Sequence, residues 1–252
     1  MTSADLPKKP ILVILHQETS TPGRVGQKLR ALGYDLDVRR PPLGCDLPQT
    51  LEGHDGAVIF GGPMSAYDDE LFLKQETDWI GVPLREEKPF LGLCLGAQLL
   101  AQHLGAGVKP HPQGEVEVGY YPIRPTPEGE ALIHWPDMVY QWHRDGFGLP
   151  TGATRLAEGL GSFPEQAFKV GPNAFGLQFH PELTMAMTYR WTVKGAERMQ
   201  CPGAQPRRAH IEGRLRYDGA IDAWLDAFLD LWLAGGTAMA LKKETAAEAA
   251  AA

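Results

Sequence analysis

The chain has 252 residues, and its 24 Lys plus Arg against 31 Asp plus Glu give a formal net charge of −7. Hydrophobic residues make up 43% and charged residues 22%, which is typical of a soluble globular protein and unlike a disordered chain. Because an acidic chain has no general electrostatic attraction for nucleic acid or an anionic membrane, we expect neither as a partner.

The apolar segments and the cysteines indicate the compartment. The apolar run at 11–15 is shorter than a signal-peptide core, and the longer stretch at 90–108 is interrupted by polar residues and glycines, so we expect no membrane span. Cys45, Cys94 and Cys201 are odd in number and form no CxxC pair, which argues against a disulfide framework and a thiolate metal site. We therefore expect a cytoplasmic protein with free thiols.

Strand and helix patterns alternate through the first part of the chain. Short buried or alternating runs predict strands at 11–15, 34–39, 56–60 and 89–93. Helical spacing predicts helices at 24–32, 71–85 and 95–104. Such alternation indicates parallel strands joined by right-handed crossovers, so the expected fold class is α/β.

The second part of the chain is less regular. Strand-like segments lie at 115–124, 138–142, 166–170 and 174–179. The segment 221–233 predicts an amphipathic helix, with apolar residues at spacings of three and four and aspartates opposite. A helix packed on the sheet is favoured over a helix that binds a partner. Residues 242–252 have almost nothing to bury, which indicates a frayed or disordered tail.

Gly92-Leu93-Cys94-Leu95-Gly96 lies where a predicted buried strand meets a predicted helix. This is the context of a nucleophile elbow, in which flanking glycines let strand and helix approach closely. The helix N-terminus also favours a thiolate over a thiol. The alternative is that Cys94 is only a small buried hydrophobe. The glycine spacing together with the junction favours the elbow.

A thiol nucleophile needs a base and a group that orients the base. His180 follows the predicted strand at 174–179, Pro181 ends that strand, and Glu182 is close enough to bond the second imidazole nitrogen. A lone histidine is more often structural. With Cys94 in a predicted elbow and Glu182 beside it, a catalytic role for His180 is favoured instead. Donors for an oxyanion are expected from the N–H of Leu95 and from the Gly-Gly-Pro at 61–63, although that tripeptide is also a common turn.

Three motifs in this order, Gly-Gly-Pro at 61–63, Gly-Leu-Cys-Leu-Gly-Ala-Gln at 92–98 and Gln-Phe-His-Pro-Glu at 178–182, resemble the class I (triad) glutamine amidotransferases. The similarity is closest to stand-alone proteins related to the amidotransferase domain of GMP synthetase, and it covers about residues 10–190. It implies a flavodoxin-like fold: an open, mostly parallel central sheet with helices on both faces, here with an additional C-terminal helix. We expect one domain over 10–235 (core 10–190, helical extension 191–235) and a tail at 236–252.

The resemblance also implies roles for individual residues. The family hydrolyses the side-chain amide of glutamine through a glutamyl thioester, releasing ammonia and glutamate. By position, Cys94 is the nucleophile, His180 the base and Glu182 the orienting acid. The implied oxyanion donors are Gly62 and Leu95, and the implied substrate-binding residues are Gln98, His143 and Asp145.

Several alternatives remain open. The sequence has no ATP-binding P-loop and no second domain to receive ammonia. The protein is therefore either a glutaminase subunit that serves a separate synthetase chain or a free-standing hydrolase of γ-glutamyl compounds. A catalytically silent ligand-binding or regulatory protein is less favoured, and a homo-oligomer is left open.

The remaining titratable residues rank lower as site candidates. No metal and no cofactor are expected, because the other histidines show no metal-ligand spacing. His16 ends the first predicted strand and could face the site. Glu115 and Glu117 are expected to be solvated.

Overall fold

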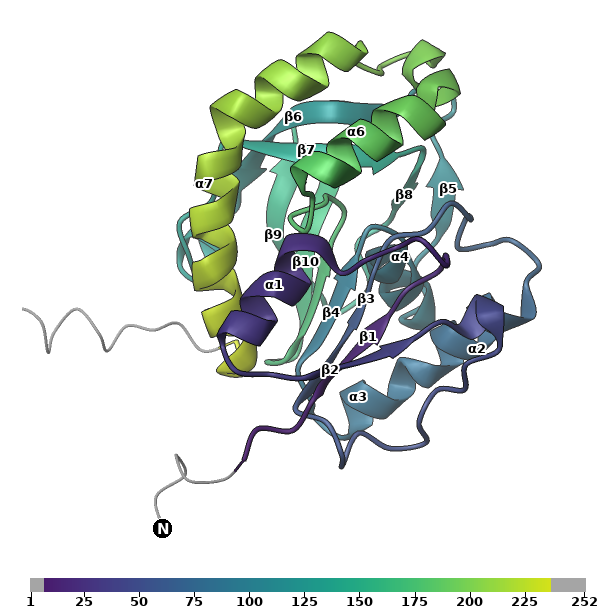
Figure 1. Ribbon diagram of the computed structural model, residues 1–252, viewed down its shortest axis with the longest axis vertical. Coiled ribbons are helices and arrows are strands. Elements are labelled where there is room, and N and C mark those ends of the chain that lie inside the picture. The colour runs from purple at the N-terminus through teal and green to yellow at the C-terminus, as the bar shows by residue number, and fades with distance from the viewer. Residues whose placement is uncertain (1–6, 237–252) are drawn as a thin grey trace, which may run out of the picture.

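The structure, a computed structural model, describes residues 7–236 (Figure 1). Its strands are β1 (Ile11–Ile14), β2 (Leu36–Arg39), β3 (Gly56–Ile59), β4 (Phe90–Leu93), β5 (Val108–Pro110), β6 (Glu117–Pro125), β7 (Met138–His143), β8 (Asp145–Phe147), β9 (Thr154–Gly159), β10 (Glu165–Val170) and β11 (Ala174–Leu177). Its α-helices are α1 (Gly23–Ala31), α2 (Leu71–Trp79), α3 (Gly81–Arg85), α4 (Leu95–His103), α5 (Pro127–Glu130), α6 (Met185–Lys194) and α7 (Arg207–Leu233). Two 3₁₀ turns, η1 (Pro41–Leu43) and η2 (Ala196–Gln200), complete the described elements.

Within residues 7–236 the central sheet has nine strands in the order β2-β1-β3-β4-β11-β10-β9-β6-β7, and β5 pairs with β8 in a small separate sheet. The pairings from β2 to β11 are parallel. The pairings from β11 to β7 are antiparallel. The expected α/β class with an open parallel sheet is confirmed, and an antiparallel extension continues the sheet at one edge.

The strands alternate their side chains between two apolar layers. Ile11 and Val13 of β1 face the layer that contains α1 and the C-terminal half of α7. Leu12 and Ile14 face the opposite layer, which contains α2, α3 and α4. Because both faces are covered, β1, β3, β4 and β11 are buried along their whole length, whereas the edge strand β2 is only half-buried. The expected helices on both faces are therefore confirmed.

The helix predicted at 221–233 is the second half of α7. Trp224, Phe228 and Trp232 of this half are buried in the α1-side layer. On the opposite face, the Lys28 ammonium of α1 lies 2.7 Å from an Asp226 oxygen. The interpretation as a helix packed on the sheet is therefore confirmed. The first half of α7 escaped prediction because its buried residues include His210 and Gly213 rather than a regular apolar stripe.

Other boundaries differ from the expectation for local reasons. The helix predicted at 71–85 is divided into α2 and α3 at Ile80. Pro83 has no N–H to donate to the preceding turn, so it is accommodated in the first turn of a new helix. α6, β8 and β9 were not predicted, although the Thr184 side chain caps α6 by accepting from the Met187 N–H at 3.2 Å. Apart from Gly236, the expected tail at 236–252 lies outside the described residues.

The parallel strands position the site. Their carboxyl ends lie at one edge of the sheet, where an open α/β sheet usually binds its ligand. His16 follows β1, Gly62 follows β3, Cys94 follows β4 and His180 follows β11. Four chain segments that are distant in sequence therefore converge at this edge. No helix within residues 7–236 is long and apolar enough to cross a lipid bilayer.

Candidate active site

Cys94 occupies a sharp turn between β4 and α4, with φ 50° and ψ −104°. A non-glycine residue in such a conformation costs roughly 1–3 kcal/mol and persists only where the surroundings hold it. Here the Cys94 N–H donates to the Leu177 carbonyl at 2.8 Å, and the Gln98 N–H donates to the Cys94 carbonyl at 3.0 Å. The strained strand-to-helix turn expected from the glycine pattern is therefore present, with its sulfur at the N-terminus of α4.

The two flanking glycines are required by close backbone packing. A Cβ on Gly92 would lie 2.4 Å from the Gly96 carbonyl oxygen, and a Cβ on Gly96 would lie 2.1 Å from the Ile59 carbonyl oxygen. Neither distance is possible for a side chain. The Gly-x-Cys-x-Gly pattern is therefore the local sequence signature of α4 pressed against β4 and β3.

His180 and Glu182 form a buried pair beside this turn. His180 Nδ1 lies 2.7 Å from Glu182 Oε1, and the two side chains are 4% and 3% exposed. The Trp191 ring packs edge-on against the imidazole, with centroids 4.9 Å apart. His180 Nε2 is buried and has no hydrogen-bond partner among residues 7–236. A Cβ on Gly61 would meet both His180 Cε1, at 2.9 Å, and Cys94 Cβ, at 3.5 Å, so the imidazole and the thiol are neighbours.

The charges in this cluster favour a protonated imidazole. Burial alone lowers the pKa of His180, but the negative charges of Glu182 and Cys94 outweigh that effect and raise the pKa to about 10. His180 therefore carries a proton at neutral pH. An imidazolium next to a cysteine at a helix N-terminus stabilises the thiolate, which is the nucleophilic form.

The N-terminus of α1 holds Glu182 in place, a contact that the sequence interpretation missed. The Arg24 N–H donates to the Glu182 carbonyl at 2.8 Å. Gly23 has φ +51°, and a Cβ on it would lie 2.1 Å from the same carbonyl oxygen. The Pro22-Gly23 dipeptide ahead of α1 could have indicated a tight turn, but nothing local links it to residue 182.

The expected oxyanion donors lie side by side. Gly62 belongs to the loop after β3, and Leu95 is the first residue of α4, where backbone N–H groups have no intrahelical partner. A Cβ on Gly62 would lie 2.9 Å from Leu95 Cδ2. The Gly62 N–H makes no hydrogen bond with any residue of the described chain. Both N–H groups are therefore available beside Cys94.

A second buried histidine–glutamate pair supports the Gly62 donor. His16 Nδ1 lies 3.1 Å from the Gly61 carbonyl oxygen, and His16 Nε2 lies 2.9 Å from Glu76 Oε2. Both side chains are fully buried. A carbonyl only accepts, so Nδ1 is the donor. Because the Gly61 carbonyl and the Gly62 N–H belong to one planar peptide unit, fixing the carbonyl also fixes the direction of the N–H. His16 lines neither hollow, so it acts on the site only through this peptide unit.

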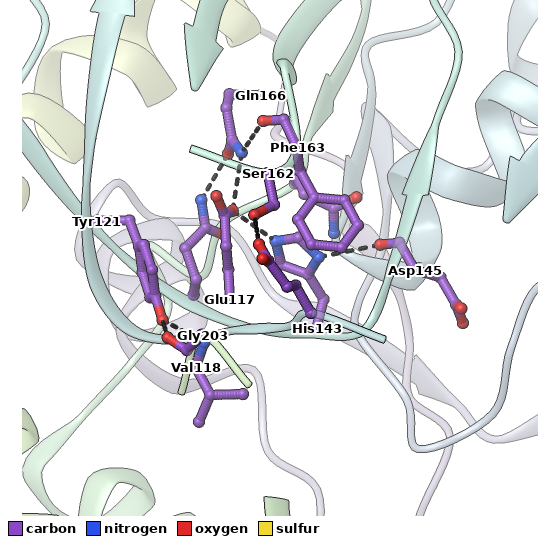
Figure 2. A network of polar contacts seen from close by, with 12 residues as sticks. Glu117, Val118, Tyr121, His143, Asp145, Ser162, Phe163, Gln166 and Gly203 are labelled. Atoms are coloured by element: carbon purple, nitrogen blue, oxygen red, sulfur yellow. Dashed lines mark hydrogen bonds and ion pairs between the residues drawn. The ribbon is translucent and has the colours of Figure 1, made fainter. Parts of the chain in front are cut away.

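A third pair holds the β7–β8 bend (Figure 2). His143 Nε2 lies 3.1 Å from Glu117 Oε2, and His143 Nδ1 lies 2.9 Å from the Asp145 carbonyl oxygen. The Gln166 amide also donates to Glu117, at 3.0 Å. The expectation of a solvated Glu117 is wrong: its side chain is buried because His143 and Gln166 satisfy its charge. Both ring nitrogens of His143 are thus occupied by the protein itself.

Gln98 and Asp145 lie where a substrate could reach them. The Gln98 amide nitrogen donates to the Asp145 carbonyl at 2.9 Å and is 3.3 Å from Gln178 Oε1. The Asp145 carboxylate accepts from the Ser65 hydroxyl and, at 3.1 Å, from the Tyr67 hydroxyl. These bonds fix both side chains at the wall of the site.

Cys94 lies between two hollows. A small one, of about 20 Å³, is lined by residues that include Gly62, Leu95, Gln98, His143 and Asp145. A larger one, of about 270 Å³, is lined by residues that include His180, Glu182, Trp142, Trp191 and Arg198. The structure thus brings all eight predicted site residues to one place. Among residues 7–236, no group of three or more His, Cys, Asp or Glu side chains could hold a metal ion.

The cationic and aromatic lining of the larger hollow was missed by sequence reasoning. It comes mainly from α6 and η2, which contribute Arg190, Trp191, Lys194 and Arg198. Neither element was predicted, so nothing placed these side chains near Cys94. The Thr184 cap is the local signal that could have revealed α6.

A family model described as Glutamine amidotransferase class-I matches residues 17–190. The chain belongs to this family. The glutamine amidotransferase-like protein YfeJ of Salmonella typhimurium is 32% identical over 185 residues, which cover 68% of this chain and 75% of that protein. A GMP synthase (glutamine-hydrolyzing) of Porphyromonas gingivalis is 31% identical over 176 residues. That match covers 68% of this chain but only 33% of the synthase.

Solved structures give the same family at the level of the fold. A glutamine amidotransferase from Thermotoga maritima superposes with a TM-score of 0.80 at 32% identity, covering 89% of this chain and 98% of the other. A glutamine amido transferase from Methylobacillus flagellatus has a TM-score of 0.84 at 24% identity, covering 90% and 95%. The class-I amidotransferase fold with a C-terminal helix is therefore shown, and family membership supports glutamine hydrolysis in general.

Proposed function

We propose that this class-I amidotransferase hydrolyses the side-chain amide of glutamine through a Cys94–His180–Glu182 triad. The observation that carries the proposal is the pairing of two features. Cys94 is held in a strained turn at a helix N-terminus, and the adjacent His180 has one nitrogen bonded to Glu182 and the other without a partner among the described residues. This is the arrangement that nucleophile, proton carrier and orienting acid require.

In the acylation step, the Cys94 thiolate attacks the amide carbon of glutamine. The N–H groups of Gly62 and Leu95 stabilise the oxyanion, and each such donor is worth roughly 3–4 kcal/mol in comparable sites. His180 then gives its proton to the departing nitrogen, the C–N bond breaks and ammonia leaves. The product is a glutamyl thioester on Cys94.

In the deacylation step, His180 takes a proton from water, and the hydroxide attacks the thioester through the same oxyanion site. The C–S bond breaks, and glutamate leaves with the oxygen of that water. Cys94 returns as a thiolate and His180 as an imidazolium. Glu182 orients the imidazole and balances its charge in both steps.

The glutamyl part of the substrate is proposed to lie against the residues of the small hollow, which at about 20 Å³ contacts this group without enclosing it. Gln98 and Asp145 line it, and Asp145 supplies a carboxylate for the substrate α-amino group. His143 acts through its bond to the Asp145 carbonyl, since both of its nitrogens are occupied. A free Cys94 thiol suits a reducing compartment, so we place the protein in the cytoplasm; Cys45 and Cys201 are also free.

The match to GMP synthases bears on the fate of ammonia. The match spans 33% of the Porphyromonas gingivalis GMP synthase. If ammonia is transferred rather than released, the acceptor we propose is a separate synthetase chain.

Glutamate release by the purified chain tests the proposal. Cys94→Ala should abolish release and Cys201→Ala should leave it unchanged, because Cys201 lines neither hollow. Hydroxylamine should trap the thioester as γ-glutamyl hydroxamate in the native chain and not in Cys94→Ala. Wild-type turnover by Cys94→Ala would refute the assignment. Iodoacetamide labelling of Cys94 no faster than of Cys45 would favour a catalytically silent protein.

A further inference from the structure

The residues proposed to act on the two halves of a substrate line different hollows. His180 lines the larger hollow and not the smaller one, whereas Gln98 and Asp145 line the smaller and not the larger. Cys94 lines both. In the proposed mechanism His180 protonates the departing nitrogen. Whatever is attached to that nitrogen therefore extends into the larger hollow.

The larger hollow is much bigger than the ammonia that glutamine releases. Its volume is about 270 Å³. Ammonia is close to water in size, and a water molecule occupies about 30 Å³ in the liquid. The space beside His180 can therefore hold a leaving group several times larger than ammonia.

The walls of this hollow combine aromatic and cationic side chains. Trp142 of β7 and Trp191 of α6 pack against one another with ring centroids 5.7 Å apart, and α6 lies over β7 (Figure 1). Arg190, Lys194 and Arg198 also line the hollow. The formal net charge of the whole chain is −7, so a cluster of cations at this place contrasts with the rest of the protein.

None of these three cations has a carboxylate partner among residues 7–236, and the Arg190 guanidinium instead donates to the Thr19 carbonyl. Neither Lys194 nor Arg198 forms an ion pair with any residue in 7–236. Two carboxylates line the hollow with them, Glu197 and Glu182, and Glu182 is already paired with His180. The hollow therefore suits a ligand group with negative charge.

Building on the proposed function, we propose that the larger hollow is a subsite for a leaving amine that carries a carboxylate, bound by Lys194 and Arg198. The substrate class is then γ-glutamyl amides of amino acids, and glutamine is a truncated member of that class. In the reaction, the amide C–N bond breaks and the His180 proton goes to the nitrogen, which leaves as a free amino acid. Water then hydrolyses the thioester to glutamate, so no further reactant is needed.

A matched pair of substrates tests this subsite. γ-Glutamylglycine and γ-glutamylglycinamide differ only in the carboxylate, and glutamine lacks the whole group. With the full chain, kcat/KM for γ-glutamylglycine should exceed that for γ-glutamylglycinamide by roughly 10- to 100-fold, the range expected of a hydrogen bond to a charged group. It should also exceed kcat/KM for glutamine. Glutamate release is the readout.

Variants test which residues cause the preference for the substrate with a carboxylate. The double variant Lys194→Gln/Arg198→Gln should reduce the γ-glutamylglycine to γ-glutamylglycinamide ratio to about one. Arg30→Gln, at an exposed arginine of α1 that lines neither hollow, should keep the native ratio. The ratio compares two substrates in one preparation, so a partly unfolded variant does not alter it. Arg198 also lines the smaller hollow. Since both substrates share the glutamyl part, a contact of Arg198 with that part affects both equally and cancels in the ratio.

The possible outcomes distinguish a failure of the proposed subsite from a failure of the proposed function. Glutamine hydrolysis that depends on Cys94, with equal kcat/KM for the two dipeptide analogues, would overturn the subsite and leave the proposed function standing. A native ratio that survives in the double variant would overturn the assignment to Lys194 and Arg198. Faster turnover of glutamine than of γ-glutamylglycine would also overturn it. Failure to hydrolyse any of the three substrates would refute the proposed function itself.

Discussion

Within the described residues, buried histidine–glutamate pairs occur on both sides of Cys94, but they differ in what the second nitrogen does. In His180–Glu182 the carboxylate bonds Nδ1, and Nε2 has no partner among residues 7–236. In His16–Glu76 the carboxylate bonds Nε2, and Nδ1 bonds a backbone carbonyl. An imidazole with a free nitrogen can transfer a proton, whereas one with both nitrogens bonded can only hold its partners. The comparison predicts different kinetic effects for the two pairs.

The largest effect is expected at His180. His180→Ala removes the proton carrier, so kcat for glutamate release should fall by at least about 10³-fold, as for other triad members. KM should change little, because Gln98 and Asp145 line the other hollow. Steady-state kinetics with glutamine measure both values. A variant that retains more than a tenth of the native kcat would show that His180 is no more than a packing residue.

The next effect concerns the charge of Glu182. The pKa of His180 is raised to about 10 from an ordinary 6.5, with Glu182 as the principal charge that raises it. A raised folded-state pKa means that the proton on His180 stabilises the fold below about pH 6.5, and that this stability is lost as the pH rises through about 10. The imidazolium form of His180, which the proposed acylation step uses, should likewise persist until the pH rises through about 10.

Glu182→Gln keeps the shape of the side chain and removes its charge. The alkaline limb of the kcat/KM profile should therefore move to lower pH in the variant. Unfolding free energies measured between pH 6.5 and 10 should also fall less steeply with pH than in the native chain. An alkaline limb at the same pH in both proteins would show that Glu182 does not set the charge state of His180.

A smaller effect is expected at His16, which positions the oxyanion donor without contacting the substrate. His16→Leu should lower kcat by roughly 10- to 100-fold, less than the loss of a whole oxyanion donor. KM should stay constant, and so should the rate at which iodoacetamide alkylates Cys94, because alkylation forms no oxyanion. His16→Asn can still donate to the Gly61 carbonyl and should recover most of the activity. Equal losses in the two variants would point to a merely structural role.

The difference between these pairs also shows what the sequence could reveal. The turn at Cys94 was predictable because its glycine spacing is a local consequence of two close backbone contacts. His180 and Glu182 were predictable because they are two residues apart at a strand end. His16 and Glu76 are separated by 60 residues, and only the assembled sheet brings them together. No spacing rule connects such a pair.

Elements without a regular apolar period also escaped prediction from the sequence. α6 and η2 bury few side chains, since most of their length faces solvent or the larger hollow. Lys194 and Arg198 therefore remained unassigned, although they distinguish this site from one built only for ammonia. The sequence placed His143 near the site but gave no indication of its contacts: its two nitrogens hold Glu117 and the Asp145 backbone.

The smallest predicted effect tests the His143–Glu117 pair. Glu117→Gln keeps an acceptor near His143 but removes the charge, so it should loosen the bond from His143 to the Asp145 carbonyl. KM for glutamine should rise roughly fivefold, the equivalent of one hydrogen bond of about 1 kcal/mol, with kcat nearly unchanged. Glu115→Gln is the matched control, because Glu115 contacts Ser162 and not His143. A fall in kcat with constant KM would instead assign the Glu117–His143 pair to the chemical step, as expected for His16.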